Sequence, residues 1–312
     1  MSVLNEQAAG VFIVAATPFS PDGALDYGSM ERMLDFYLSK GISGMTVLGM
    51  MGEASKLSDA ESKEFVRRVV RRVAGAVPIV VGVSNPGFVA MADLAKSAVD
   101  NGCAGVMVAP PPTLRTEEQI IQYFQHAASA LGTIPFVLQD FPLSTGVHFT
   151  SKTLVKIAEI LPTFVMLKHE DWPGLRKISQ IRDESVQSGG RRISILVGNG
   201  GLFFPEELGR GADGAMTGFA YPEMMVDVLE AHRASNGDLA RDLFDAYLPL
   251  MRYEQQPGIG LAVRKYVLSK RGVIACEFQR EPKTLLGPRE YAEIDTLIVR
   301  QDRRLEELGR RP

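Results

Sequence analysis

Cysteine is scarce in this sequence: Cys103 and Cys276 are the only two among 312 residues. Two thiols exclude a disulfide framework and a cysteine-rich metal site. No uninterrupted apolar run approaches the roughly 18 residues that a transmembrane helix needs. The N-terminal MSVLNEQAAG also lacks the basic segment, followed by an apolar one, that marks a secretory signal. We therefore expect a cytoplasmic protein that does not enter a membrane.

An excess of charge is also absent, with 34 lysine and arginine residues against 37 aspartate and glutamate residues and a formal net charge of −3. This balance gives no electrostatic drive toward nucleic acid or an anionic membrane, so we expect neither partner. A Walker pattern is missing, as is a G-x-G-x-x-G after the first apolar run, which argues against a nucleotide cofactor. The four histidines have no metal-ligand spacing, and we expect no metal.

Eight short apolar runs are present, each followed by an amphipathic stretch, and their starts lie 19 to 34 residues apart. A parallel strand with its crossover helix and loops occupies about 30 residues, so the spacing predicts eight βα units. Near-continuous hydrophobic strands indicate burial on both faces. We predict an α/β fold, a (β/α)8 TIM barrel, with an open doubly wound sheet as the alternative. The runs begin near Val11, Gly44, Pro78, Ala104, Ile134, Thr163, Ile193 and Ala212.

The last quarter of the chain has a different pattern. After the eighth unit's helix, around residues 221–236, helical periodicity continues over residues 238–253, 260–270 and 288–308. No linker-like segment precedes these helices. We therefore predict a catalytic barrel over residues 1–236 and a C-terminal helical extension over residues 237–312, packed on the barrel or on a partner subunit.

One lysine stands where barrel enzymes place their chemistry. Active sites of such barrels lie at the C-terminal ends of the strands, and Lys168 ends the apolar run TFVML. Burial favours the neutral amine, which is a nucleophile toward carbonyl groups and forms a Schiff base. Glu170 lies two residues on, so strand alternation places both side chains on one face. The alternative is a structural lysine that is paired with Glu170 or Asp171.

Two glycine-rich loops follow the second and seventh apolar runs, at Gly49–Glu53 and at Gly198–Gly201. Exposed backbone N–H groups in such loops can hold a carboxylate. Glycine in a βα turn is, however, usually a requirement of the turn itself. Both interpretations remain open from the sequence.

Four short motifs point to one enzyme family. Thr17-Pro18-Phe19 follows the first apolar run, and Gly49-Met50-Met51-Gly52-Glu53 stands where that family has G-T-T-G-E. Gln139-Asp140-Phe141-Pro142 stands where it has Y-N-x-P, and Lys168 falls on its imine-forming lysine. Over essentially residues 10–300 the chain resembles the dihydrodipicolinate synthase / N-acetylneuraminate lyase family. The resemblance implies a (β/α)8 barrel, a covalent imine with a 2-oxo acid, no further cofactor, and a homo-oligomer, either a dimer or a tetramer.

Four positions, in three places of the chain, depart from the family's pattern. The tyrosine that relays protons in the family is Gln139 here, and an amide has no useful pKa for that work. The paired threonines that connect this relay to a neighbouring subunit are Met50 and Met51. The arginine that clamps the second substrate's carboxylate is Ser144. These departures argue against dihydrodipicolinate synthase activity and weaken the case for sialic acid cleavage.

Other segments resemble the branch of 2-keto-3-deoxy sugar-acid dehydratases, particularly those acting on L-2-keto-3-deoxyarabonate. In the implied reaction Lys168 forms an imine at C2, loss of a C3 proton gives an enamine, and the enamine expels the C4 hydroxyl. Candidate proton carriers are Glu170, Asp140 and a water oriented by Gln139. The segments that carry this resemblance are residues 139–142, 214–218 and 272–275.

The resemblance also implies substrate contacts. Backbone donors of the Gly49–Gly52 loop, helped by Thr17, are expected to hold the carboxylate, while Gly198 and Thr217 shape the pocket near the imine. Glu53 serves either catalysis or the structure of its loop, and the two methionines either pack across a subunit contact or narrow the pocket. The predicted substrate-binding set is Thr17, Gly49, Met50, Met51, Gly52, Glu53, Pro142, Gly198, Asn199 and Thr217.

Two alternatives to dehydration remain. The same enamine can undergo retro-aldol cleavage, which releases pyruvate and an aldehyde. The loss of these family side chains also suggests a catalytically silent barrel that only binds 2-oxo acids. Retention of Lys168 at a strand end argues against the silent barrel, because a binding module has little use for a desolvated amine.

Overall fold

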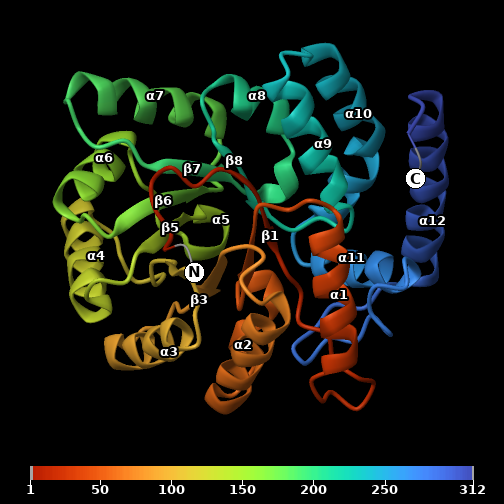
Figure 1. Ribbon diagram of the computed structural model, residues 1–312, viewed down its shortest axis with the longest axis horizontal. Helices are drawn as coiled ribbons and strands as arrows, with labels where there is room; N and C mark the ends of the chain where they lie inside the picture. The colour runs from red at the N-terminus through yellow and green to blue at the C-terminus, as the bar shows by residue number, and fades with distance from the viewer. Residues whose placement is uncertain (1–2, 311–312) are drawn as a thin grey trace.

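Eight short parallel strands close into a barrel in chain order, with β8 pairing with β1 (Figure 1). The computed structural model describes residues 3–310. The prediction of a (β/α)8 TIM barrel is confirmed, and each strand begins within two residues of the predicted apolar run. The strands are β1 (Gly10–Val14), β2 (Gly44–Val47), β3 (Ile79–Gly82), β4 (Gly105–Val108), β5 (Phe136–Asp140), β6 (Phe164–His169), β7 (Ser194–Val197) and β8 (Gly214–Thr217).

Helices form a ring around the strands, and three short 3-10 helices, η1 to η3, lie in the loops after β2 and β7. The seventh unit is the shortest, as the spacing predicts, because α8 has only six residues. The elements are α1 (Tyr27–Ser39), η1 (Met50–Gly52), η2 (Ala54–Lys56), α2 (Asp59–Val73), α3 (Phe88–Asp100), α4 (Glu117–Leu131), α5 (Pro142–Thr145), α6 (Ser151–Ile160), α7 (Gly174–Gln187), η3 (Asn199–Gly201), α8 (Phe204–Gly209) and α9 (Pro222–Arg233).

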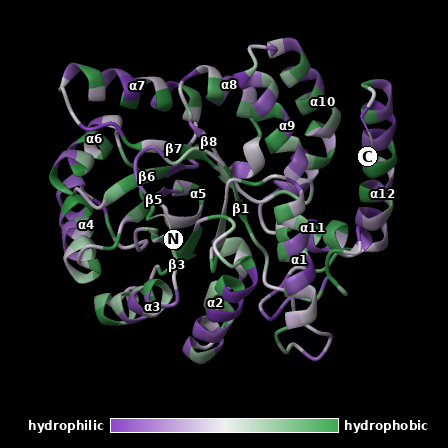
Figure 2. Cartoon of the chain, in the orientation of Figure 1, coloured by the Kyte–Doolittle hydropathy of each residue, from purple (hydrophilic) through white to green (hydrophobic). Residues whose placement is uncertain are grey.

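Strand alternation divides the hydrophobic residues into two layers. One set, exemplified by Val137 and Met166, fills the inside of the barrel. The other set, exemplified by Leu138 and Leu167, packs between the strands and the surrounding helices. In Figure 2 hydrophobic colour follows the strands, whereas the helices of the outer ring carry both colours. This alternation decides which polar residues at the strand ends point into the barrel mouth.

The C-terminal extension consists of α10 (Gly237–Glu254), α11 (Gly260–Lys270) and α12 (Pro288–Glu307). These bounds agree with the predicted helices to within one residue. Helix α10 packs against α9 and α12, and α12 forms the outer edge of the molecule (Figure 1). The division of the chain at residue 236 stays a prediction, and residues 1–2 and 311–312 of its two ranges lie outside the described residues.

Within residues 3–310, no helix is both long and apolar enough to cross a bilayer.

Candidate active site

Lys168 lies near the end of β6 and points into the barrel mouth. Its side chain is buried, and its Nζ lies 3.0 Å from Oε2 of Glu170, which is buried as well. Strand alternation thus brings the two residues together, as the sequence predicts. His169, between them, turns to the outside of the barrel, where its Nε2 meets the carbonyl oxygen of Gly174 at 3.1 Å. The structure therefore contains a buried amine with a carboxylate within hydrogen-bond distance.

Gln139 completes this cluster from the neighbouring strand. β5 pairs with β6 so that Gln139 stands opposite Lys168. The Gln139 amide Nε2 donates to Glu170 Oε2 at 2.7 Å. One carboxylate oxygen of Glu170 therefore contacts both the lysine amine and the glutamine amide. The place of the family's tyrosine is thus taken by a group that orients Glu170 and does not titrate.

The loop after β7 fixes Glu170 from the other side. A Cβ on Gly198 would lie 2.2 Å from Cγ and 2.4 Å from Oε1 of Glu170, so any larger residue there would displace the Glu170 side chain. The amide of Asn199 donates to the Glu170 carbonyl oxygen at 3.0 Å. These two predicted site residues therefore set the position of Glu170.

Asp140 lies elsewhere than the sequence interpretation places it. It follows Gln139 on β5 and so points out of the barrel, where its Oδ2 accepts from Lys177 of α7 at 2.6 Å. His169 Nδ1 lies 3.5 Å from the same oxygen, and Lys177 also contacts Asp171 at 2.9 Å. Asp140 belongs to this outer ion-pair cluster and does not face Lys168. Its interpretation as a proton carrier beside the imine is therefore wrong.

The loop after β2 forms one wall of the barrel mouth. Gly49 and Met50 line a cavity that opens at this mouth, and Met50 is 42% exposed. Met51 is half-buried and packs against the hydrophobic residues inside the barrel. Thr17 donates its hydroxyl to the carbonyl oxygen of Gly52 at 2.5 Å. Thr17 thus braces this loop, and its own hydroxyl hydrogen is occupied.

Glu53 ends the same loop but points away from the cavity. Its carboxylate is buried and accepts from Lys265 of α11, from Lys56 Nζ at 2.9 Å and from the Arg280 N–H at 3.2 Å. Of the two roles that the sequence leaves open for Glu53, these contacts support the structural one.

Two further predicted residues have structural contacts at the mouth. Thr217, at the end of β8, accepts from the N–H of Gly200 at 2.8 Å and so ties the loop after β7 to β8. Pro142 is buried at the first position of the short helix α5, where a proline is well tolerated because no N–H is needed.

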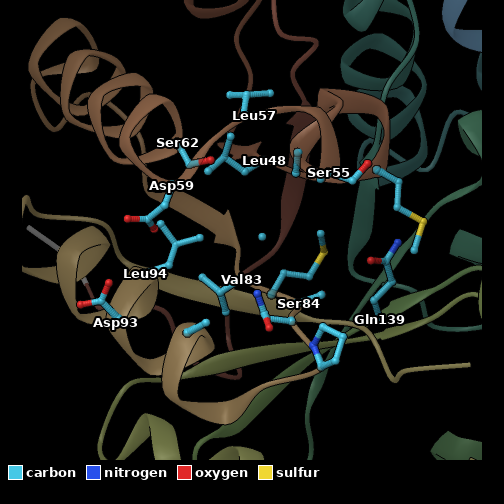
Figure 3. A pocket seen from close by; sticks show the side chains of 18 of the residues that line it. Leu48, Ser55, Leu57, Asp59, Ser62, Val83, Ser84, Asp93, Leu94 and Gln139 are labelled. Carbon is cyan, nitrogen blue, oxygen red and sulfur yellow. The ribbon is translucent and has the colours of Figure 1, made fainter. Parts of the chain in front are cut away.

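A cavity of about 760 Å³ leads outward from Gln139 between α2 and α3. Gln139 lies at one end of it, and Asp59 and Asp93 lie at the other (Figure 3). Its wall also includes Ser84 and Asn85, which lie two and three residues after the end of β3. The sequence analysis missed these two residues, although polar residues just beyond the C-terminal end of a barrel strand are the signal that singled out Glu170.

Residues that could hold a metal are not grouped in the described chain. Among residues 3–310 there is no set of three or more histidine, cysteine, aspartate or glutamate side chains with suitable geometry. The chemistry of the cluster around Lys168 is that of an amine, a carboxylate and an amide.

Comparisons with known proteins agree with this architecture. The model of the dihydrodipicolinate synthetase family matches residues 7–301. An L-2-keto-3-deoxyarabonate dehydratase from Azospirillum brasilense is 31% identical over 94% of this chain and 94% of its own. A 4-hydroxy-tetrahydrodipicolinate synthase from Pseudomonas aeruginosa is 28% identical over 90% of this chain and 94% of its own. The crystal structure of a dihydrodipicolinate synthase from Rhodopseudomonas palustris is 50% identical, covers 96% of this chain and all of its own, and superposes with a TM-score of 0.94.

Proposed function

The chain belongs to the dihydrodipicolinate synthetase family of lyases, and from that premise we propose that it dehydrates a 2-keto-3-deoxy sugar acid through an imine on Lys168. The observation that carries the proposal is the buried cluster in which Glu170 Oε2 lies 3.0 Å from the Lys168 amine and 2.7 Å from the Gln139 amide. Imine chemistry needs a neutral amine and an adjacent group that takes and returns protons. Glu170 lies where it can take the proton from the lysine amine and later return it.

The first half of the reaction forms the imine. Glu170 takes the proton from the Lys168 ammonium, and the free amine attacks the C2 carbonyl carbon. The resulting carbinolamine loses its hydroxyl as water when Glu170 returns that proton to it, and an iminium and the Glu170 carboxylate remain. This cation withdraws electrons from C3 and so acidifies the C3–H bond. No cofactor besides the lysine takes part.

The second half removes water from the sugar chain. Glu170 accepts the C3 proton, and the electrons of the C–H bond form an enamine. The enamine pushes out the C4 hydroxyl, which leaves as water with a proton returned from Glu170. Hydrolysis of the unsaturated imine then frees Lys168 and the product. The net change is the loss of one water, and a positioned acid–base group contributes about 10² to 10⁴ in rate.

The substrate carboxylate is assigned to the Gly49–Gly52 loop. Gly49 and Met50 line the cavity, and the Thr17 hydroxyl fixes the loop through the Gly52 carbonyl. Backbone N–H groups of such a loop suit a carboxylate, because they donate without the entropy loss of a long side chain. Thr217 holds the loop after β7 through the Gly200 N–H, and Gly198 of that loop packs against Glu170.

Pyruvate-dependent aldol chemistry, either cleavage or a synthase-like condensation, is the second candidate. The names of the relatives from Pseudomonas aeruginosa and Rhodopseudomonas palustris favour it. Against the synthase stand Gln139, which cannot relay protons, and Ser144, which offers no positive charge to a second carboxylate. Retro-aldol cleavage shares every step up to the enamine, so only products separate it from dehydration.

The test supplies L-2-keto-3-deoxyarabonate and identifies the product by mass. Loss of one water supports the dehydratase, whereas release of pyruvate supports the aldolase and overturns our proposal. Related 2-keto-3-deoxy sugar acids of other length and stereochemistry are screened in parallel. Condensation of pyruvate with aspartate semialdehyde at the rate of a true synthase would contradict the interpretation of Gln139 and Ser144.

A further inference from the structure

We propose that Lys265 of the C-terminal extension is a positioning residue for the reaction: through Glu53, it holds the Gly49–Gly52 loop where that loop binds the substrate carboxylate. The inference rests on the proposed function, because it assumes that this loop binds the carboxylate. It concerns a residue more than 200 positions away in the chain, outside the barrel.

Lys265 is a completely buried cation with few partners. Its Nζ donates to Glu53 and to the carbonyl oxygen of Phe278 at 2.9 Å, and it lies 4.7 Å from the centre of the Phe19 ring. Burial holds the pKa of Lys265 below its ordinary value, even though the Glu53 carboxylate acts in the opposite direction. A buried ion pair of this kind is weak evidence for stability, because desolvation of both ions offsets their attraction. Its geometric effect is the better explanation for its presence.

The pair acts directly on the loop. Glu53 is the next residue after Gly52 and has a left-handed backbone with φ of 54°, which a non-glycine residue adopts only under constraint. Gly52 in turn receives the Thr17 hydroxyl on its carbonyl oxygen. The loop is thus held at its end by Thr17, which follows β1, on one side and by Lys265 of α11 on the other. A shift of Glu53 must therefore move the N–H groups of the preceding residues.

The neighbouring residue, Arg264, holds a second loop of the mouth in the same way. It is buried, pairs with Glu254 at 2.7 Å and donates to the carbonyl oxygen of Gly218 at 2.5 Å. Gly218 directly follows Thr217 at the end of β8. Two adjacent cations of α11 therefore hold the loops after β2 and β8, the two strands that flank β1 in the barrel. This arrangement gives the helical extension a direct influence on the mouth.

The experiment compares two ketones in imine trapping. Full-length protein is incubated with pyruvate, or with acetone, in which a methyl replaces the carboxylate, and is reduced with borohydride. The rate of adduct formation on Lys168 is measured by mass spectrometry. In Lys265→Met we expect the preference for pyruvate over acetone to fall about tenfold or more, since a displacement near 1 Å costs up to about 100-fold. The acetone rate should stay within about threefold of wild type.

Two further variants keep the test decisive. Glu53→Gln preserves the shape of the side chain but removes its charge, and it should lower the same preference even if Lys265→Met does not fold. Lys270→Met is the matched control, because Lys270 lies on the exposed face of the same helix and pairs with Asp295 of α12. This control should keep the wild-type preference.

The outcomes separate the inference from the proposed function. If wild-type protein forms no adduct with pyruvate, the proposed function fails. If wild type forms the adduct but both Lys265→Met and Glu53→Gln keep its preference for pyruvate, the positioning role of Lys265 is wrong and the proposed function stands.

Discussion

Gly198→Ala adds one methyl group that touches no substrate, yet the structure predicts a severe loss of activity. The added Cβ would lie 2.2 Å from Cγ and 2.5 Å from Cδ of Glu170, whereas real Cβ contacts essentially never fall below 3.0 Å. The carboxylate must therefore move by about 1 Å, away from its 3.0 Å contact with Lys168. A displacement of this size in a catalytic group costs about 100-fold in rate. We expect a loss of that order in imine formation.

Gly198 has a φ of −109° and a ψ of −141°, and the variant tests the contact of the added methyl group with Glu170. The assay is the rate of borohydride-trapped adduct formation with pyruvate, measured beside the melting temperature. Gly209→Ala is the control, since a Cβ at Gly209, at the end of α8, meets nothing within 4 Å. A folded Gly198→Ala protein that forms the adduct within about threefold of the wild-type rate would refute the role given to Glu170.

Two other predictions concern groups outside the mouth. Asp140→Asn removes one of the two carboxylates that pair with Lys177, and Asp171 remains as the other. We therefore expect the free energy of unfolding in urea to fall by about 1–3 kcal/mol, while the trapping rate of the folded protein changes less than about threefold. A large loss of trapping in a stable variant would restore Asp140 to the mechanism. Burial raises the pKa of Glu207 to about 8, above its unfolded value, so its stabilising contribution is complete at low pH and is lost as pH rises toward about 8. Glu207→Gln should therefore flatten the dependence of the melting temperature on pH between about 5 and 8, and an unchanged slope would contradict the burial of Glu207 as a neutral acid.

Local patterns were sufficient to predict much of the site. The regular spacing of the apolar runs predicts the eight strands, because a parallel strand that is buried on both faces needs a nearly continuous apolar sequence. Alternation alone places Lys168 and Glu170 together. The same rule, applied to Gln139 and Asp140, puts Asp140 outside the barrel; the interpretation failed there because it followed the motif and not the alternation.

The remaining features depend on contacts between distant segments. Glu53 meets Lys265 and Arg280, which lie more than 200 residues away. The periodicity of the sequence predicts the helix α11, but it does not predict which loop that helix contacts. The tight contact between Gly198 and Glu170 is similar, since a glycine in a turn looks the same whether it serves the turn or makes room for a neighbour.

The most direct test of the central claim is to incubate the protein with pyruvate, reduce it with borohydride and map the modified peptide. We predict a single covalent adduct on Lys168, which is absent from Lys168→Ala and from Lys168→Arg, a variant that keeps the positive charge without a nucleophilic amine. No adduct with any 2-oxo acid, or an adduct that persists in both variants, would contradict the account.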